Sequence, residues 1–123
     1  MEEFTILGKK VSKPMKKLEA FAAPENVKTV ILTSDEVTSL CPITGQPDWY
    51  TIEIEYQPDK LCLESKSLKL YFWTFREQGH FCEQLSNIIL KDIQEAIKPK
   101  TLKVTVEMKP RGGIKIKSVA ELP

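Results

Sequence analysis

Two segments of this chain alternate strictly between apolar and polar residues, and they constrain the fold more than any other feature. Every second side chain is apolar in Tyr50–Tyr56, and Leu102–Met108 repeats the pattern. Side chains of a β-strand point alternately to opposite faces, so each segment is predicted to be a strand with one buried and one solvated face. Such strands are typical of antiparallel sheets that are covered on one side.

Two amphipathic segments between these strands supply the cover. Apolar residues fall on one helical face in residues 64–78 and again in residues 81–97, so two consecutive helices are predicted. Ser65 or Ser67 is expected to cap the first helix. Short connections favour placing both helices on the same face of the sheet.

The outer strands complete the expected order. Val27–Leu40 is rich in β-branched residues, and Ile114–Lys117 begins a strand after a turn at Pro110–Gly113. The order is therefore ββααββ, an α+β fold with an antiparallel sheet and two helices on one face. Such a sheet leaves open edges, which commonly pair with other subunits.

The chain length of 123 residues fits one domain. We assign residues 27–123 to that domain. Residues 1–26 are rich in Lys, Pro and Ala and are interpreted as an extended N-terminal segment. The net charge of +1 gives no field that selects nucleic acid or membrane.

Cellular location and metal content are also predicted from the residues. No apolar run is long enough to span a membrane, and the N-terminus lacks the pattern of a signal peptide, so the protein is expected to be cytoplasmic. Three cysteines at irregular spacing favour free thiols. A single histidine and the lack of paired ligand motifs predict no metal site.

Chemistry is suggested first by the segment Cys41-Pro-Ile-Thr-Gly-Gln-Pro-Asp48. Cys41 follows a strand, and two prolines and a glycine turn the chain so that Asp48 returns toward the thiol. A thiolate nucleophile beside a carboxyl group that moves protons is the minimum requirement for covalent catalysis. The alternative is a partly buried loop cysteine and an aspartate that caps the turn.

Three motifs together resemble the QueF family of 7-cyano-7-deazaguanine reductases. They are the Cys41–Asp48 segment, Glu64-Ser-Lys-Ser-Leu-Lys69 and Pro110-Arg-Gly-Gly-Ile114, in the same order and spacing. The resemblance covers about Val27 to Lys117 and is to the short, single-module members. It implies the tunnelling fold (T-fold), assembly into a ring of identical subunits with sites at their interfaces, and a deazapurine substrate. It further implies NADPH-dependent reduction of the nitrile to a primary amine, a step in the synthesis of the tRNA base queuosine.

The resemblance also implies a role for each matching residue. Cys41 would add to the nitrile carbon to form a thioimide, and Asp48 would act as the acid and base. The residues expected to bind NADPH phosphates are Lys66, Lys69 and Arg111. The residues expected to line the substrate pocket are Glu64, Ser65, Phe81, Cys82 and Glu83, of which Glu83 would recognise the purine-like edge.

One position departs from the family pattern. Cys82 stands where the family has a histidine, between Phe81 and Glu83, and the lone His80 lies two residues earlier. We expect His80 to be exposed at the helix start. Cys82 either fills the space of the lost imidazole or forms a protective disulfide with Cys41.

Two other functions compete with nitrile reduction. A QueF-like amidinotransferase would act without NADPH on the nitrile already carried in tRNA, as in archaeosine synthesis, and only this alternative requires direct tRNA binding. A non-catalytic ring that binds a purine-like ligand is the third hypothesis. The three cations Lys66, Lys69 and Arg111 favour the reductase, and the paired Cys41 and Asp48 argue against the non-catalytic ring.

Overall fold

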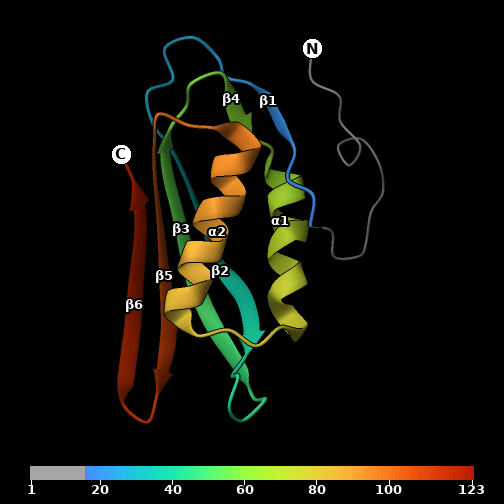
Figure 1. Cartoon of the computed structure of the whole chain (residues 1–123), viewed down its shortest axis with the longest axis vertical. Coiled ribbons are helices and arrows are strands. Elements are labelled where there is room, and N and C mark those ends of the chain that lie inside the picture. The colour runs from blue at the N-terminus through green and yellow to red at the C-terminus, as the bar shows by residue number, and fades with distance from the viewer. Residues whose placement is uncertain (1–15) are drawn as a thin grey trace.

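Four antiparallel strands form the main sheet of the structure, a computed structural model that describes residues 16–123. In chain order they are β2 (Val30–Leu40), β3 (Pro47–Gln57), β5 (Thr101–Arg111) and β6 (Ile114–Leu122). Their spatial order is β2-β3-β5-β6, so every neighbouring pair in the sheet is antiparallel (Figure 1). The strands predicted from alternation are confirmed, and each extends by a few residues beyond its predicted range.

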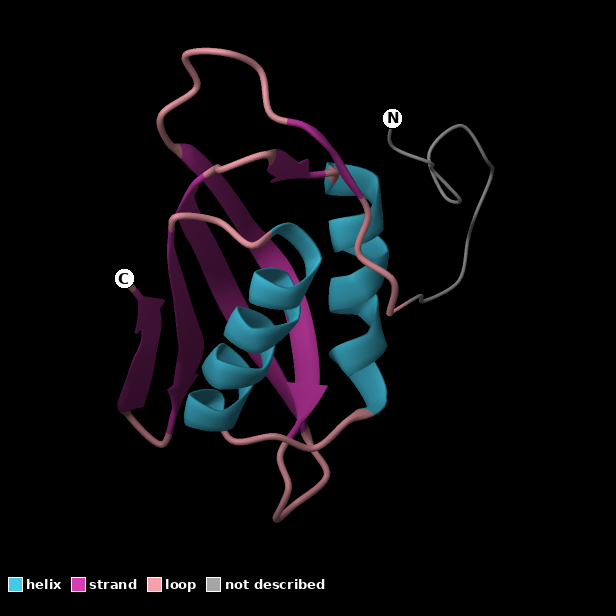
Figure 2. Ribbon diagram, turned by 45° about the horizontal axis from the view of Figure 1, so that its top comes forward, coloured by secondary structure: helices cyan, strands magenta, loops and turns pink. Residues whose placement is uncertain are grey.

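Two helices cover one face of this sheet, as predicted (Figure 2). Helix α1 (Ser65–Trp73) continues into the single-turn 3₁₀ helix η1 (Thr74–Glu77), and α2 (Cys82–Ile97) follows. The alternating side chains of β3 and β5 pack against the helices. Fully buried members of the core include Ile52, Ile54, Phe75, Leu85, Ile89, Ile93 and Val104. No helix in residues 16–123 is long and apolar enough to cross a bilayer.

The start of α1 differs from the prediction. Neither Ser65 nor Ser67 is the cap. Glu64 is the N-cap, and its carboxylate accepts hydrogen bonds from Lys66 N at 2.6 Å and Ser67 N at 2.7 Å. A carboxylate in this position satisfies two backbone donors and lies favourably at the positive end of the helix dipole. Ser67 instead accepts from Glu19 N at 2.9 Å and so attaches the preceding chain to the helix.

Two short strands were not predicted. β1 (Ala20–Ala22) pairs with β4 (Leu61–Leu63) in a separate two-stranded sheet beside the start of α1. β1 lies inside the segment that was interpreted as extended, residues 1–26, whose first fifteen residues lie outside the described part of the chain. The boundary at residue 26 stays a prediction.

Strand β2 contains a bulge near its middle. Ser34 pairs with Ile52 on β3, but the next paired residue, Val37, lies opposite Tyr50. Three steps on β2 therefore match two steps on β3, which is the count of a β-bulge. Val37 and Ser39 beyond it are buried on the helix-covered face.

The turn between β5 and β6 is narrower than predicted. Pro110 and Arg111 still belong to β5, and Arg111 pairs with Ile114. Only Gly112 and Gly113 form the turn, with φ angles of 58° and 79°. Left-handed conformations at both positions suit a tight hairpin turn and strain any residue that carries a Cβ atom.

Candidate active site

Cys41 lies directly after β2, in the tight loop that leads into β3. Its N–H donates to Gln46 O at 2.8 Å, and its carbonyl accepts from Gly45 N at 2.9 Å. Gly45 has a φ of 72°, a conformation that glycine adopts without strain. These bonds close the loop and hold the backbone of Cys41 beside the first residues of β3.

Hydrogen-bond donors surround the sulfur of Cys41. Interactions with the Thr44 hydroxyl, with the backbone N–H groups of Thr44 and Ile43, and with the Arg111 guanidinium favour the thiolate. These contacts, of which the Thr44 hydroxyl contributes most, lower the pKa of the Cys41 thiol from 9.0 to about 6, although desolvation opposes the shift. The thiolate, which is the attacking form, therefore predominates at neutral pH.

Asp48 lies on β3 opposite Ser39, with its side chain only 3% exposed. Arg111 Nε is 2.9 Å from Asp48 Oδ1. The contact is an ion pair without hydrogen-bond alignment, because no donor among the described residues points at Oδ1 with hydrogen-bond geometry. Cys41, Asp48 and Arg111 thus form one cluster, although Arg111 was predicted to serve the cofactor.

Two buried hydroxyl groups lie behind this cluster. Ser39 Oγ donates to Tyr50 Oη at 2.9 Å, and both residues are fully buried. Burial raises the pKa of Tyr50, and the nearby Asp48 charge adds to the shift, so the phenol stays protonated. Sequence reasoning missed this pair, because Ser39 and Tyr50 look like ordinary strand residues.

The start of α2 brings three predicted substrate residues to the same end of the molecule. Phe81 is 50% exposed and Glu83 is exposed, so both side chains are accessible to a ligand. Cys82 points inward, and its sulfur donates to Val106 O at 3.5 Å. Burial raises the pKa of Cys82 to about 11, which makes it a poor nucleophile.

His80 differs from its expected exposed position. It precedes α2 and is half-buried, with its ring edge-on to Phe75. His80 Nε2 lies 2.8 Å from Gln78 Oε1, and burial lowers the pKa of the imidazole. His80 N donates to Leu40 O at 3.3 Å, so its backbone borders the residue before Cys41.

Glu64 and Ser65, also predicted substrate residues, lie at the opposite end of the molecule. They begin α1 beside β4, whereas the β2–β3 loop and the β5–β6 turn lie at the other end (Figure 1). Helix α1 and η1 separate Glu64 from that end by roughly 20 Å, from their lengths and rises. One chain does not bring Glu64 and Cys41 to the same small ligand.

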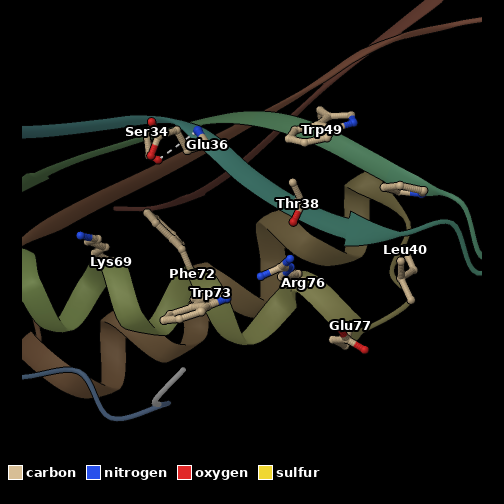
Figure 3. Close-up of a pocket in the computed structure, with 11 residues that line it drawn as sticks. Ser34, Glu36, Thr38, Leu40, Trp49, Lys69, Phe72, Trp73, Arg76 and Glu77 are labelled. Carbon is tan, nitrogen blue, oxygen red and sulfur yellow. Dashed lines mark hydrogen bonds between the residues drawn. The ribbon is translucent and has the colours of Figure 1, made fainter. Parts of the chain in front are cut away.

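A cavity of about 530 Å³ lies between the β2 edge of the sheet and α1 with η1 (Figure 3). Lys69, Phe72 and Trp73 border it on the helix side, and Trp49, 52% exposed, belongs to its lining from the other face of β3 (Figure 3). Leu40 and Pro47 also line it, and they are the chain neighbours of Cys41 and Asp48. The remaining lining residues are Ser34, Glu36, Thr38, Arg76 and Glu77.

Lys66 lies one helical turn before Lys69, at the start of α1, and is half-buried. The structure thus separates the three predicted cofactor residues, since Arg111 lies at the Cys41 end. No group of three or more His, Cys, Asp or Glu residues that could hold a metal ion occurs in residues 16–123.

Comparison with known families identifies this arrangement. The family model described as QueF-like protein matches residues 47–122, which is more than half of the chain. The chain belongs to the QueF family. The matched region includes Asp48, Glu83 and Arg111, and it begins shortly after Cys41.

Individual QueF relatives extend the match across most of the chain. The NADPH-dependent 7-cyano-7-deazaguanine reductase of Nitrosococcus oceani is 46% identical over 112 residues, covering 89% of this chain and 87% of the relative. The reductase of the same name from Bacteroides fragilis is 47% identical over 121 residues, covering 94% and 80%.

A QueF-like solved structure confirms the T-fold. The archaeosine synthase QueF-Like in its apo form aligns with a TM-score of 0.72 and 28% identity. The alignment covers 76% of this chain and 92% of that chain.

Proposed function

We propose that this protein reduces the nitrile of 7-cyano-7-deazaguanine to the aminomethyl group with NADPH, in the synthesis of queuosine. The observation that carries the proposal is the Cys41 thiolate, held by donors of its own loop beside the buried Asp48. The relatives that match most of the chain at 46% and 47% identity carry this activity in their names.

Cys41 and Asp48 divide the first chemical step between them. The Cys41 thiolate forms a bond to the nitrile carbon, and Asp48 takes up from solvent the one proton that the step needs. One π pair of the carbon–nitrogen bond moves to nitrogen, which receives the proton from Asp48. The product is a thioimide with a C=N bond, and the step adds S–H across the nitrile with no net gain or loss of electrons.

The cavity beside α1 fits the cofactor. Lys69 and Arg76 supply cations for phosphate groups, and the rings of Phe72 and Trp73 supply flat apolar walls for a heterocycle. NADPH bound there would supply hydride to the carbon, and the reduction of a nitrile to an amine requires two such hydrides. Lys66 at the start of α1 is placed to extend the cationic surface along the same helix.

Substrate recognition falls to residues at the start of α2. Glu83 is exposed there in the first turn, and its carboxylate can accept hydrogen bonds from the adjacent N–H groups of a guanine-like ring. Phe81, half exposed, offers an apolar contact for that ring.

We infer that a second copy of the chain completes the site. Glu64 and Ser65 lie at the opposite end of the molecule from Cys41, so they reach the same substrate only from a neighbouring subunit. A ring of subunits satisfies this requirement and also covers open sheet edges. Light scattering that shows a fully active monomer would contradict the inference.

The decisive assay follows NADPH oxidation with and without 7-cyano-7-deazaguanine. Wild type should consume NADPH only when the nitrile is present. Without NADPH, the nitrile should give a covalent adduct, which Cys41→Ala abolishes and Asp48→Asn slows. Lys69→Ala should raise the KM for NADPH and leave adduct formation unchanged.

The amidinotransferase alternative predicts the opposite result for NADPH consumption. In that case the adduct forms with the nitrile carried in tRNA, an amine releases it, and NADPH is not consumed. An enzyme that gives adduct but never oxidises NADPH therefore excludes the reductase.

A further inference from the structure

Arg111 occupies a position that its expected phosphate-binding role does not explain. It is the last residue of β5, and the two glycines that follow make the tightest turn of the main sheet. Pairing with Ile114 fixes its backbone. The side chain, 43% exposed, extends from this hairpin toward the β2–β3 loop and contacts Asp48 at 2.9 Å.

The Arg111 guanidinium therefore bridges two acidic groups, the Cys41 thiol at the start of the β2–β3 loop and the Asp48 carboxyl group just after its end. Arg111 Nε lies 2.9 Å from Asp48 Oδ1, and the interaction of the guanidinium with Cys41, followed by the charge of Asp48, raises the pKa of Arg111. The planar fork of arginine carries five N–H donors, enough to serve a sulfur and a carboxylate at once.

The need for such a bridge follows from the charges of the site. A carboxylate and a thiolate brought close together repel each other. Asp48 is 3% exposed, so water screens this repulsion poorly. A cation between the two groups offsets the repulsion and permits both to be charged.

We propose that Arg111 belongs to the nucleophile's own site, where it holds the Cys41 thiolate and the Asp48 carboxylate together in the resting enzyme. The inference rests on the proposed function only in taking Cys41 as the nucleophile. It assigns Arg111 to the formation of the attacking group, before any cofactor binds.

The test measures the alkylation rate of Cys41 by iodoacetamide against pH, with neither nitrile nor NADPH present. Arg111→Gln should shift the midpoint of the profile to higher pH and leave the plateau at high pH in place. The alkylation midpoint of Arg111→Lys should lie between those of wild type and Arg111→Gln, because a single ammonium group replaces the planar guanidinium with its five donors. Lys109→Gln is the matched control, since it removes one positive charge from the same strand, beside Trp49. Its midpoint should coincide with wild type.

A phosphate-only role for Arg111 gives a different result. The alkylation midpoint of Arg111→Gln then equals that of wild type, and only the KM for NADPH rises; this result would overturn the proposal. A protein that shows the shifted midpoint but reduces no nitrile would disprove the proposed reaction and leave the role of Arg111 standing.

A measurement on the wild-type chain covers the case in which Arg111→Gln does not fold. The guanidinium N–H resonances of Arg111 should titrate with the same midpoint as Cys41 alkylation, because the guanidinium interacts with the thiolate. That inflection should vanish in Cys41→Ala. A resonance that stays constant through the alkylation midpoint would refute the contact.

Discussion

Replacing Thr44 by valine removes one hydroxyl from the Cys41 loop and keeps the shape of the side chain. The Thr44 hydroxyl is the largest of four hydrogen-bond contacts that lower the pKa of Cys41 from 9.0 to about 6. An equal share of that shift would be three quarters of a unit, so we expect the midpoint to rise by about one pH unit. Thr44 also accepts from Gln46 N at 3.3 Å, a weak bond whose loss leaves the loop closed by its backbone bonds.

The consequence is a pH-dependent loss of reactivity. At a pH near 6 the thiolate fraction should fall from about one half to about one tenth, a roughly fivefold slower alkylation by iodoacetamide. Near pH 9 both proteins are mainly thiolate, and the valine variant should react as fast or slightly faster, because thiolate nucleophilicity rises with pKa. Thr44→Ser keeps the hydroxyl and should follow wild type.

Cys62 and Cys82 are each 3% exposed and should react slowly, and the residual rate of Cys41→Ala corrects for them. Circular dichroism establishes that Thr44→Val is folded. If its alkylation midpoint equals that of wild type in the folded protein, the hydroxyl does not stabilise the thiolate and the reasoning is refuted.

Four further predictions concern stability and the other thiols. Tyr71→Phe should lower the free energy of unfolding by about 1–3 kcal/mol in urea titrations, because Tyr71 Oη donates to Asp92 Oδ2 at 2.6 Å from a 1% exposed position; equal midpoints would contradict it. Ile93→Ala, fully buried, should cost about 2–5 kcal/mol, whereas Ile114→Ala, 66% exposed, should change stability by less than about 0.5 kcal/mol. Alkylation at mildly alkaline pH should give one adduct by mass spectrometry, on Cys41, since the pKa of Cys82 is about 11; a second adduct on Cys82 in the folded protein counts against its assigned burial. Finally, the Cys41 thiol has a lower pKa in the folded chain than its ordinary 9.0, so its contribution to stability is complete above about pH 9 and is lost as pH falls through about 6. The stability difference between wild type and Cys41→Ala should follow that window, and a difference independent of pH would exclude the linkage.

The spacing of apolar residues predicted those strands and helices that bury one face along their whole length. Apolar and polar residues alternate along β3, and α2 has one apolar stripe from Leu85 to Ile97. The pattern of each element therefore predicts which of its faces is buried. The three-residue strands β1 and β4 are too short for any period and depend on each other. The predicted cap of α1 was wrong because Glu64, Ser65 and Ser67 lie within one turn and each can cap a helix. Which of them does so depends on where the folded chain begins the helix.

The candidate site also contains residues that the sequence predicted and residues that only the fold brings together. Cys41 and Asp48 were found because their own loop brings them together. Arg111 joins them only through the β3–β5 register, which no local pattern encodes. Thr44 was missed because its role depends on how the loop folds around the sulfur. Their assigned roles stay predictions until the variants are measured.

The bulge in β2 decides which side of the sheet carries the nucleophile. Before it, even-numbered residues such as Ser34 share a face with Ile52; after it, odd-numbered residues such as Val37 and Ser39 do so. Removing one residue at the bulge would leave Ser34 and Val37 two steps apart in a regular strand, so Cys41 would keep its side of the sheet. Removing one residue between the bulge and Cys41 would instead turn Cys41 to the other face. A single deletion in this strand is therefore compatible with the chemistry at the bulge, where one residue is extra, and not in the regular pairing that follows it.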